Sequence, residues 1–358
     1  MDGLPISVLV IGCGNMGASH AKAYEQHPGF AICGLVSRGI SKKELNETLI
    51  ADYPLFADYQ AALEATKPDA VCISTYPDTH EAIALKALEV GCHLFVEKPL
   101  ATTVEGCNRI IEVAKNMGKQ VVVGYILRHH PTWIKFIATA HQLGKPLVMR
   151  MNLNQQSQGY MWEVHKNLMQ SLSPIVDCGV HYLDVMCQMT QAKPVSVSAI
   201  GVRLSADVPV DNYNYGQLQI RFDDGSVGWY EAGWGPMMSE TAFFIKDVIG
   251  PKGSASIISE EGLYNDGSDE IERHTKSNTI RWHHSSMNEK NEFNKADDFI
   301  RFEDDPSHQQ LCNNEQDFFY RAIQDRLNLE QHLNDAVNSL QIVLACDQAV
   351  RLQKTISL

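Results

Sequence analysis

The chain has 358 residues, of which 44% are hydrophobic and 20% are charged. This composition is typical of globular proteins, and the length suffices for two domains that each bury a core. The formal net charge of −13 repels phosphate backbones and anionic lipid surfaces. Neither nucleic acid nor a membrane is therefore an expected partner.

The cysteines indicate a reducing environment. There are nine, an odd number, and none shows Cys-x-x-Cys spacing, which favours free thiols over a disulfide framework. The first ten residues contain Asp2 and Pro5 and lack a basic segment before a long apolar run. We therefore expect neither a signal peptide nor a spanning helix, and a cytoplasmic location. A mature secreted enzyme that had lost its leader would show the same features.

The first third of the chain alternates short β-branched runs with segments of helical period. Strands are expected at 6–11, 31–36, 70–74, 94–96 and 120–124, and helices at 15–27, 41–51, 58–66, 79–90 and 104–117. Such alternation predicts crossover units on a parallel sheet. The prediction for residues 1–124 is a doubly wound α/β domain of Rossmann type.

The rhythm changes after Gly124, where a second domain over 125–358 is expected. Helices are predicted at 174–189, 314–326 and 333–353, and strands at 195–202, 215–222, 227–231 and 243–249. The turns at 223–226 and 250–253 favour hairpins. We therefore predict an α+β domain with a large, open, mostly antiparallel sheet. Residues 265–307 are polar and weakly periodic, and no element is assigned to them.

A glycine-rich turn follows the first predicted strand. In "IGCGNMG", Gly12 permits a tight turn, Gly14 lets the backbone approach a pyrophosphate, and Gly17 lets the helix pack closely on the strand. Asn15 and Met16 open the helix, whose N-terminal N–H groups attract anions. A turn that binds nothing is the alternative, but strand, helix and third glycine stand in the register that a dinucleotide site requires.

The end of the second predicted strand indicates which dinucleotide binds. NAD sites place Asp or Glu there to bind the ribose 2′-hydroxyl, whereas this chain has Ser37 and Arg38, with Lys42 and Lys43 close by and no acid before Glu44. These cations favour the 2′-phosphate of NADP, with NAD as a possible second cofactor. The alternative is that they form only the solvated start of a helix.

An apolar strand runs directly into charged residues in "HLFVEKPLA". Ligands of open α/β sheets lie beyond the carboxyl ends of the strands, and Lys98 is placed there. Its ammonium could bind a substrate oxygen during hydride transfer, with Glu97 holding or tuning it and Pro99 fixing the backbone. An ordinary surface ion pair is the alternative.

The motif "SPIVDCGVHYLD" predicts a helix that begins at Ser173. Asp177 and His181 are then four residues apart on one face, where the carboxylate can orient the imidazole as an acceptor of the alcohol proton. A solvated helix pair is the alternative. We expect Gly179 to allow a flat ring to approach, and Asp184 to share the edge of this face.

Other polar and aromatic residues are considered as binding groups. Tyr160, Trp162 and His165 are expected on a loop before this helix, where they could stack on a sugar or pack in the core or a lid. The pairs His129–His130 and His283–His284 point apart in any regular element, and no carboxylate or cysteine completes a ligand set. No metal is expected.

Together, Gly12 to Gly17, Glu97-Lys98-Pro99 and the Asp177-x-x-x-His181 motif resemble the glucose-fructose oxidoreductase / inositol dehydrogenase / MocA family. The match extends to "THEAIALKALEVGCHLFVEKPLA" and "IGPKGSASI". The resemblance implies an NAD(P)-dependent oxidoreductase of sugars, polyols or cyclitols, with Lys98, Asp177 and His181 as catalytic residues and His181 as proton shuttle. It also implies a terminal helix, about 333–353, that packs on the first domain.

The resemblance implies further site residues. Thr75, Tyr76 and His80 correspond to a segment that borders the cofactor in relatives, and Arg128 is a candidate substrate contact. The chain departs from relatives at Ser171 to Pro174, where they often have a glycine-rich lead into the helix. It departs again at Leu127 to Pro131, where they often read Arg-Arg-Phe-Asp-Pro.

Two other functions remain open within this resemblance. One is glycoside cleavage through transient oxidation on a tightly held cofactor, and the other is a cofactor-binding regulator without chemistry. Retention of all three catalytic positions argues against the regulator. Association into a homodimer or homotetramer is expected, because faces of open sheets are common association surfaces.

Overall fold

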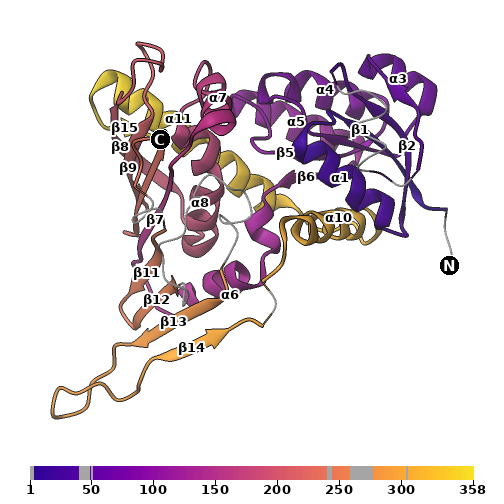
Figure 1. Cartoon of the computed structure of the whole chain (residues 1–358). Helices are drawn as coiled ribbons and strands as arrows, with labels where there is room; N and C mark the ends of the chain where they lie inside the picture. The colour runs from indigo at the N-terminus through magenta and orange to yellow at the C-terminus, as the bar shows by residue number, and fades with distance from the viewer. Residues whose placement is uncertain (1–3, 40–48, 50, 240–243, 259–276, 304) are drawn as a thin grey trace. The chain divides into compact units, whose positions relative to one another are not determined.

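The computed structural model describes residues 4–39, 49, 51–239, 244–258, 277–303 and 305–358 (Figure 1). The chain divides into two compact units. Unit 1 comprises residues 1–126 and 309–337, and unit 2 comprises residues 127–308 and 338–358. The helix expected at 41–51, with Lys42, Lys43 and Glu44, falls almost entirely outside the described residues.

Unit 1 contains a six-stranded parallel sheet in the order β3-β2-β1-β4-β5-β6. Its strands are β1 (Ile6–Ile11), β2 (Phe30–Val36), β3 (Leu55–Phe56), β4 (Ala70–Ile73), β5 (His93–Glu97) and β6 (Val121–Gly124). β4 and β6 are buried along their whole length, as expected for strands covered on both faces. The predicted doubly wound domain is confirmed, and the short strand β3 is an addition to it.

The helices between these strands are α1 (Asn15–Gln26), α3 (Tyr59–Thr66), α4 (Pro77–Glu89) and α5 (Val104–Met117). Local signals account for their ends. Thr103 caps α5 by accepting a hydrogen bond from the Gly106 N–H, and Gly118 ends the helix with φ of 63°, a backbone conformation that suits glycine. Asp58 caps α3 in the same way through the N–H of Ala61.

The chain returns to unit 1 through α10 (His308–Gln324), whereas the expectation concerned residues 333–353. Phe319 and Ala322 are buried in one core with Tyr24 of α1 and Phe30 of β2. The helix α11 (Glu330–Leu352) follows, and its residues from Asn338 onward belong to unit 2. The apolar face of α10 is the physical reason that this helix covers the sheet.

Unit 2 contains a nine-stranded sheet in the order β14-β13-β12-β11-β7-β10-β9-β8-β15 (Figure 1). Its strands are β7 (Val148–Gln155), β8 (Pro194–Val202), β9 (Tyr215–Phe222), β10 (Val227–Trp234), β11 (Lys246–Gly250), β12 (Gly253–Ile258), β13 (Thr279–His284), β14 (Asp298–Arg301) and β15 (Ile356–Ser357). All neighbours are antiparallel except β7 and β10, which are parallel. The predicted open, mostly antiparallel sheet and both hairpins are confirmed.

Besides the later part of α11, the described residues of unit 2 contain further helical elements. They are the 3₁₀ helix η1 (Ile126–His129), which begins at the end of unit 1, α6 (Pro131–Ala140), α7 (Gly159–Leu168) and α8 (Pro174–Thr190). β7, α6 and α7 were not expected. Residues 265–307, to which no element was assigned, contain β13 and β14, although 265–276 lie outside the described residues. Within the described residues, no helix is long and apolar enough to span a membrane.

Candidate active site

The glycine-rich turn between β1 and α1 has the geometry of a phosphate cradle. Gly12 has φ of +90°, and a Cβ there would lie 2.5 Å from the carbonyl oxygen of Ser74. A Cβ on Gly17 would lie 1.7 Å from the carbonyl oxygen of Gly12, whereas a Cβ on Gly14 would meet nothing within 4 Å. Packing therefore requires glycine at positions 12 and 17, and Gly14 leaves open space.

The N-terminus of α1 is suited to an anion. Gly14 is its N-cap residue and provides no side-chain cap, and the first turn, which begins with Asn15 and Met16, carries no acidic residue. Helix N-terminal N–H groups without a capping side chain bind phosphate through hydrogen bonds and the helix dipole. The residues present therefore fit the pyrophosphate of a dinucleotide.

Ser37 and Arg38 follow β2 directly, beside the end of β1. The main-chain N–H of Ser37 donates to the carbonyl oxygen of Phe56 at 3.0 Å, which fixes the strand end. Arg38 is exposed. Because the carboxyl ends of parallel strands share one edge of the sheet, Arg38 lies on the same edge as the cradle.

Thr75 and Tyr76 follow β4, the other neighbour of β1. Tyr76 is 73% exposed and is the N-cap residue of α4. His80, by contrast, is fully buried, with Nδ1 2.8 Å from the carbonyl oxygen of Pro99 and Nε2 3.0 Å from that of Thr75. Burial lowers the pKa of His80. A neutral ring has one N–H, so His80 donates to one of these two carbonyl oxygens at a time and lies between the two main-chain segments.

Lys98 stands one residue beyond β5 and is half-buried. Its main-chain N–H donates to Oε2 of Glu97 at 3.2 Å, and the Lys98–Pro99 peptide bond is cis. The other oxygen of Glu97, Oε1, lies 2.6 Å from Nε2 of His20 on α1. Glu97 therefore joins the main chain at Lys98 to α1.

The predicted pair Asp177 and His181 is on α8 of unit 2, and Ser173 is the N-cap residue of this helix. The Ser173 hydroxyl accepts from the N–H of Val176 at 3.2 Å and donates to the carboxylate of Asp347 at 2.7 Å. Of the 17 residues of this helix, all but Asp177, His181 and Gln188 are buried. A helix that is otherwise enclosed thus leaves the predicted pair accessible at i and i+4 on one face.

Gly179 does bring α8 close to a flat ring, but this ring belongs to the protein. A Cβ on Gly179 would lie 3.1 Å from the ring of Tyr230 on β10 and 3.2 Å from Val343 of α11. The absence of a side chain at Gly179, which was expected to admit a ligand, instead lets the helix pack closely on its own sheet. The tight packing fixes the position of Asp177 and His181 on the helix.

Gln155 and Trp234 were not predicted from the sequence as part of the site. They form a hydrogen-bonded group with Cys178, the residue after Asp177. Trp234 donates from Nε1 to Oε1 of Gln155 at 2.6 Å, and the Cys178 thiol lies 3.5 Å from the same oxygen. Gln155 and Trp234 end β7 and β10 and are paired in register. They therefore occupy the shared carboxyl end of the one parallel pair in this sheet. No local pattern marked them, because β7 itself was not expected.

The loop expected around Tyr160, Trp162 and His165 is wrong, because these residues lie on the helix α7. Tyr160 is 76% exposed and Trp162 is half-buried. His165 is buried, with its ring stacked on Trp234 at 4.5 Å between centroids and its Nδ1 2.9 Å from the Ser157 hydroxyl. This environment is that of a packed side chain, which was the alternative considered for it.

Comparison with known proteins identifies the family of this chain. Residues 6–125 match the family described as "Oxidoreductase family, NAD-binding Rossmann fold", and residues 133–256 match the GFO/IDH/MocA C-terminal domain. The chain belongs to the GFO/IDH/MocA family. The resemblance inferred from the sequence motifs is thereby confirmed.

Three relatives illustrate the family. The chain is 31% identical to an inositol 2-dehydrogenase/D-chiro-inositol 3-dehydrogenase of Halalkalibacterium halodurans over 53% of this chain and 54% of that protein. It is 25% identical to D-glucoside 3-dehydrogenase of Escherichia coli over 76% and 82%. The scyllo-inositol dehydrogenase of Lactobacillus casei, solved with NAD(H) and scyllo-inositol, has a TM-score of 0.75 at 18% identity, covering 99% of both chains. The first match spans about half the length of the relative.

Arg128, a candidate substrate contact, lies on η1. Its Nε donates to Oδ2 of Asp184 at 2.9 Å, and its Nη2 contacts Oδ1. Gln188 donates to Oδ2 at 2.8 Å. Asp184, which was expected at the edge of the face that carries His181, is buried. Burial raises the pKa of Asp184, and the guanidinium of Arg128 opposes this shift.

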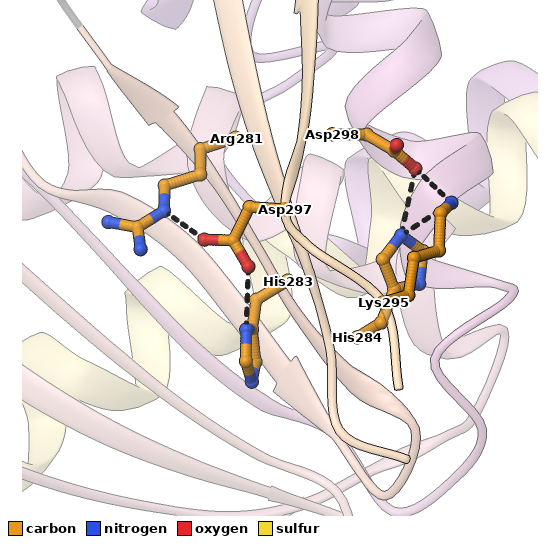
Figure 2. A network of polar contacts seen from close by, with 6 residues as sticks. All are labelled: Arg281, His283, His284, Lys295, Asp297 and Asp298. Carbon is orange, nitrogen blue, oxygen red and sulfur yellow. Dashed lines mark hydrogen bonds and ion pairs between the residues drawn. The ribbon is translucent and has the colours of Figure 1, made fainter. Parts of the chain in front are cut away.

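The histidine pair on β13 does have carboxylate partners, contrary to expectation. His283 lies 2.8 Å from Asp297 and His284 lies 2.8 Å from Asp298; both contacts are drawn in Figure 2. Arg281 contacts Asp297 at 2.5 Å, and Lys295 contacts Asp298 at 2.5 Å. Strand pairing brings β13 and the residues beside β14 together, which the sequence did not reveal. Because cations already neutralise both carboxylates, we interpret this group as an ion-pair network.

Proposed function

We propose that this protein is an NAD(P)-dependent dehydrogenase that transfers a hydride between a nicotinamide and a hydroxyl-bearing carbon of a sugar, polyol or cyclitol. The observation that carries the proposal is the accessibility of Asp177 and His181 on the otherwise buried helix α8. The open N-terminus of α1 and family membership support it. The named substrates of the relatives suggest the substrate class.

The proposed reaction separates a hydride from a proton. When bound, the nicotinamide supplies the hydride acceptor. His181 accepts the hydroxyl proton, and Lys98 donates a hydrogen bond to the same oxygen as its negative charge develops. Asp177, one helical turn before His181, orients the imidazole and stabilises its protonated form. In the reverse direction, His181 returns the proton to the alkoxide oxygen.

We further propose a preference for NADP(H). Ser37 cannot replace the carboxylate that binds a ribose 2′-hydroxyl, and the exposed guanidinium of Arg38 follows it directly. A charge-assisted contact from arginine to phosphate contributes about 1.5–3 kcal/mol. That corresponds to a preference of roughly 10- to 150-fold.

Substrate binding is assigned to residues from several elements. We propose Lys98, Asp177 and His181 around the reacting oxygen, with Tyr160 and Trp162 as aromatic contacts to a sugar face. Arg128 and His165 were also candidates. Arg128 is paired with Asp184, and His165 is stacked on Trp234. These contacts favour a role in supporting the site over direct contact with the substrate.

A homodimer or homotetramer is proposed from the face of the nine-stranded sheet. Val148, Val227 and Ile249 are each between 37% and 41% exposed. Val148 is paired with Val227 across β7 and β10 and with Ile249 across β7 and β11. These three side chains form an apolar row over adjacent strands, which suits a self-association surface.

The experiment that tests the function is a substrate panel. Purified protein is incubated with monosaccharides, inositols, methyl glucosides and their keto forms, each with NAD(H) and NADP(H), while absorbance of the reduced nicotinamide is followed. Stoichiometric formation or consumption of the reduced nicotinamide supports the proposal. Cleavage of a nitrophenyl glycoside without net change in the nicotinamide would contradict it and indicate a hydrolase.

A further inference from the structure

A group of buried polar side chains lies between three elements of unit 1. His20 comes from α1, Glu97 from β5, and Cys312, Glu315 and Gln316 from α10. His20 and Gln316 are fully buried, and Glu315 is 1% exposed. Because burying polar groups is costly unless they are hydrogen-bonded, such a group requires a structural or functional reason.

His20 occupies the centre of this group and contacts both sides. Its Nδ1 lies 2.9 Å from the side-chain amide nitrogen of Gln316, and its Nε2 lies 2.6 Å from Oε1 of Glu97. With the amide donating to Nδ1, the proton of the neutral ring is on Nε2, which donates to the carboxylate. The ring also packs edge-on against Phe95 at 4.8 Å between centroids.

Glu97 transmits this contact to the main chain at Lys98. Its Oε2 accepts from the N–H of Lys98 at 3.2 Å, while Oε1 is held by His20. A series of contacts therefore runs from Gln316 on α10 through His20 and Glu97 to Lys98.

Of the two carboxyl groups in this group, Glu97 is the one that faces N–H donors. Burial, and then the negative charge of Glu97, raise the pKa of Glu315 well above its ordinary value. Glu315 is thus held neutral, whereas the carboxylate of Glu97 receives two N–H groups, from His20 and from Lys98. A carboxylate with two donors is fixed in orientation, and so is the peptide that it binds.

We propose that His20 is a positioning residue that acts through Glu97 to hold the main chain at Lys98. The inference rests on the proposed function, in which Lys98 binds the reacting oxygen. A lysine ammonium ends a flexible four-carbon stem, so the direction in which the stem leaves the main chain determines where the ammonium can reach. Small misplacements of a reacting group cost up to about 10²-fold in rate.

The segment is also held on its far side. Nδ1 of the buried His80 lies 2.8 Å from the carbonyl oxygen of Pro99, the residue after Lys98. Lys98 thus stands between two residues, Glu97 and Pro99, that are each anchored to a buried histidine. The contact of His80 with Pro99 does not involve His20, so removal of His20 alone should loosen the segment without releasing it.

The test compares His20→Ala, His20→Gln and a control, His93→Ala. His93 is at the opposite end of β5 and accepts a hydrogen bond from the Gln120 N–H, so it is a strand histidine without contact to Glu97. Hydrogen exchange of the Lys98 amide is measured by NMR in the full chain and needs no substrate. kcat and KM are measured with myo-inositol and each cofactor.

We expect His20→Ala to speed exchange of the Lys98 amide selectively and to lower kcat at least about 10-fold, with KM for the cofactor within about twofold. His20→Gln should recover part of the slow exchange of the Lys98 amide and part of kcat, because the glutamine amide can donate to Glu97. His93→Ala should change the melting temperature but neither kcat nor the Lys98 amide. Unchanged exchange and kcat in a folded His20→Ala variant would overturn the inference.

Two further outcomes are separable. If His20→Ala does not fold, His20→Gln, Glu97→Gln and their double variant decide: effects on kcat that are additive contradict a shared path. His20, Cys312 and Glu315 each offer one atom that could bind a metal ion, and these three atoms lie within 4.8 Å of one another. Stoichiometric zinc in the purified protein, lost together with kcat on chelation, would replace positioning by metal binding. Full activity of Lys98→Met would overturn the proposed function instead.

Discussion

Trp234 donates a hydrogen bond from its indole nitrogen to the side-chain oxygen of Gln155 at 2.6 Å, where β7 and β10 end side by side. The Cys178 thiol lies 3.5 Å from the same oxygen. Gln155 thus links the carboxyl end of the parallel strand pair to the residue after Asp177. Both Gln155 and Trp234 are buried, so their polar atoms depend on each other.

Replacing Gln155 by Leu should destabilise unit 2, because the indole N–H loses its acceptor. An unsatisfied buried donor costs about 1–3 kcal/mol in the free energy of unfolding, measurable by urea denaturation. In a Trp234→Phe background the same change should cost less, because the donor is already absent. Equal costs in both backgrounds would show that the hydrogen bond is not the cause.

Gly14→Ala and Gly17→Ala should separate cofactor binding from folding. Gly14 has φ of −68° and open space for a Cβ, so the free energy of unfolding should change by less than about 0.5–1 kcal/mol. The methyl group would project where the phosphates are proposed to bind, and we expect NADPH affinity to fall at least about 10-fold, measured by fluorescence titration.

Gly17→Ala is the matched variant, with the opposite expectation. Its Cβ would lie 1.7 Å from the carbonyl oxygen of Gly12, so the strand and helix must separate. Overpacking of this kind costs about 1–3 kcal/mol or more. A stable Gly17→Ala variant with unchanged cofactor affinity would contradict the packing described for the cradle.

Arg38→Ala should reduce kcat/KM with NADP(H) by roughly 10- to 150-fold and leave that with NAD(H) nearly unchanged. The reason is loss of the guanidinium contact to the 2′-phosphate. Arg109→Ala is a suitable control, because Arg109 is an exposed arginine of α5 paired with Glu81 at 2.7 Å. Equal loss with both cofactors would indicate that Arg38 does not select between them.

His181→Asn should lower kcat by about 10²- to 10⁴-fold while the melting temperature changes little, because the proposed acid and base is removed from a half-buried position. Gln188→Ala removes a hydrogen bond to the buried Asp184 on the same helix, so it is the comparison for a purely structural change. A His181→Asn variant that melts early, with normal turnover in its folded fraction, would show a structural role.

Stability of unit 1 should depend on pH through Glu315. Its pKa is raised by burial and by Glu97, so the native state retains a proton that the unfolded state loses near its ordinary pKa of 4.5. The free energy of unfolding should therefore fall as pH rises above 4.5 until the pKa of the native state is reached. The decline should be about 1.4 kcal/mol for each pH unit between these two pKa values.

Glu315→Gln should remove this decline, so the variant becomes more stable relative to the native protein as pH rises. Urea denaturation between about pH 5 and pH 9 measures the difference. Glu112→Gln, which changes a carboxylate of α5 outside this group, should leave the slope unaltered. Parallel pH profiles for Glu315→Gln and the native protein would show that Glu315 is not held neutral.

Local patterns in the chain were enough to predict much of this protein. The period of apolar residues located β1, α5 and β9 at the boundaries that the structure shows. The cradle glycines and the spacing of Asp177 and His181 were also visible, because turn geometry and helical faces depend on residues close in sequence. Strand β7 was missed because Arg150, Asn152 and Asn154 interrupt its apolar character.

The tertiary structure decided which side chains meet. His20 contacts Glu97 across 77 positions of sequence, and Arg128 contacts Asp184 across 56. No periodicity encodes such pairs, since they follow from strand order and from the packing of α10 and α8. Sequence alone thus determined many of the elements and the chemistry available to them. Long-range packing determined which polar groups remain accessible and which support others, because burial is a property of the whole fold.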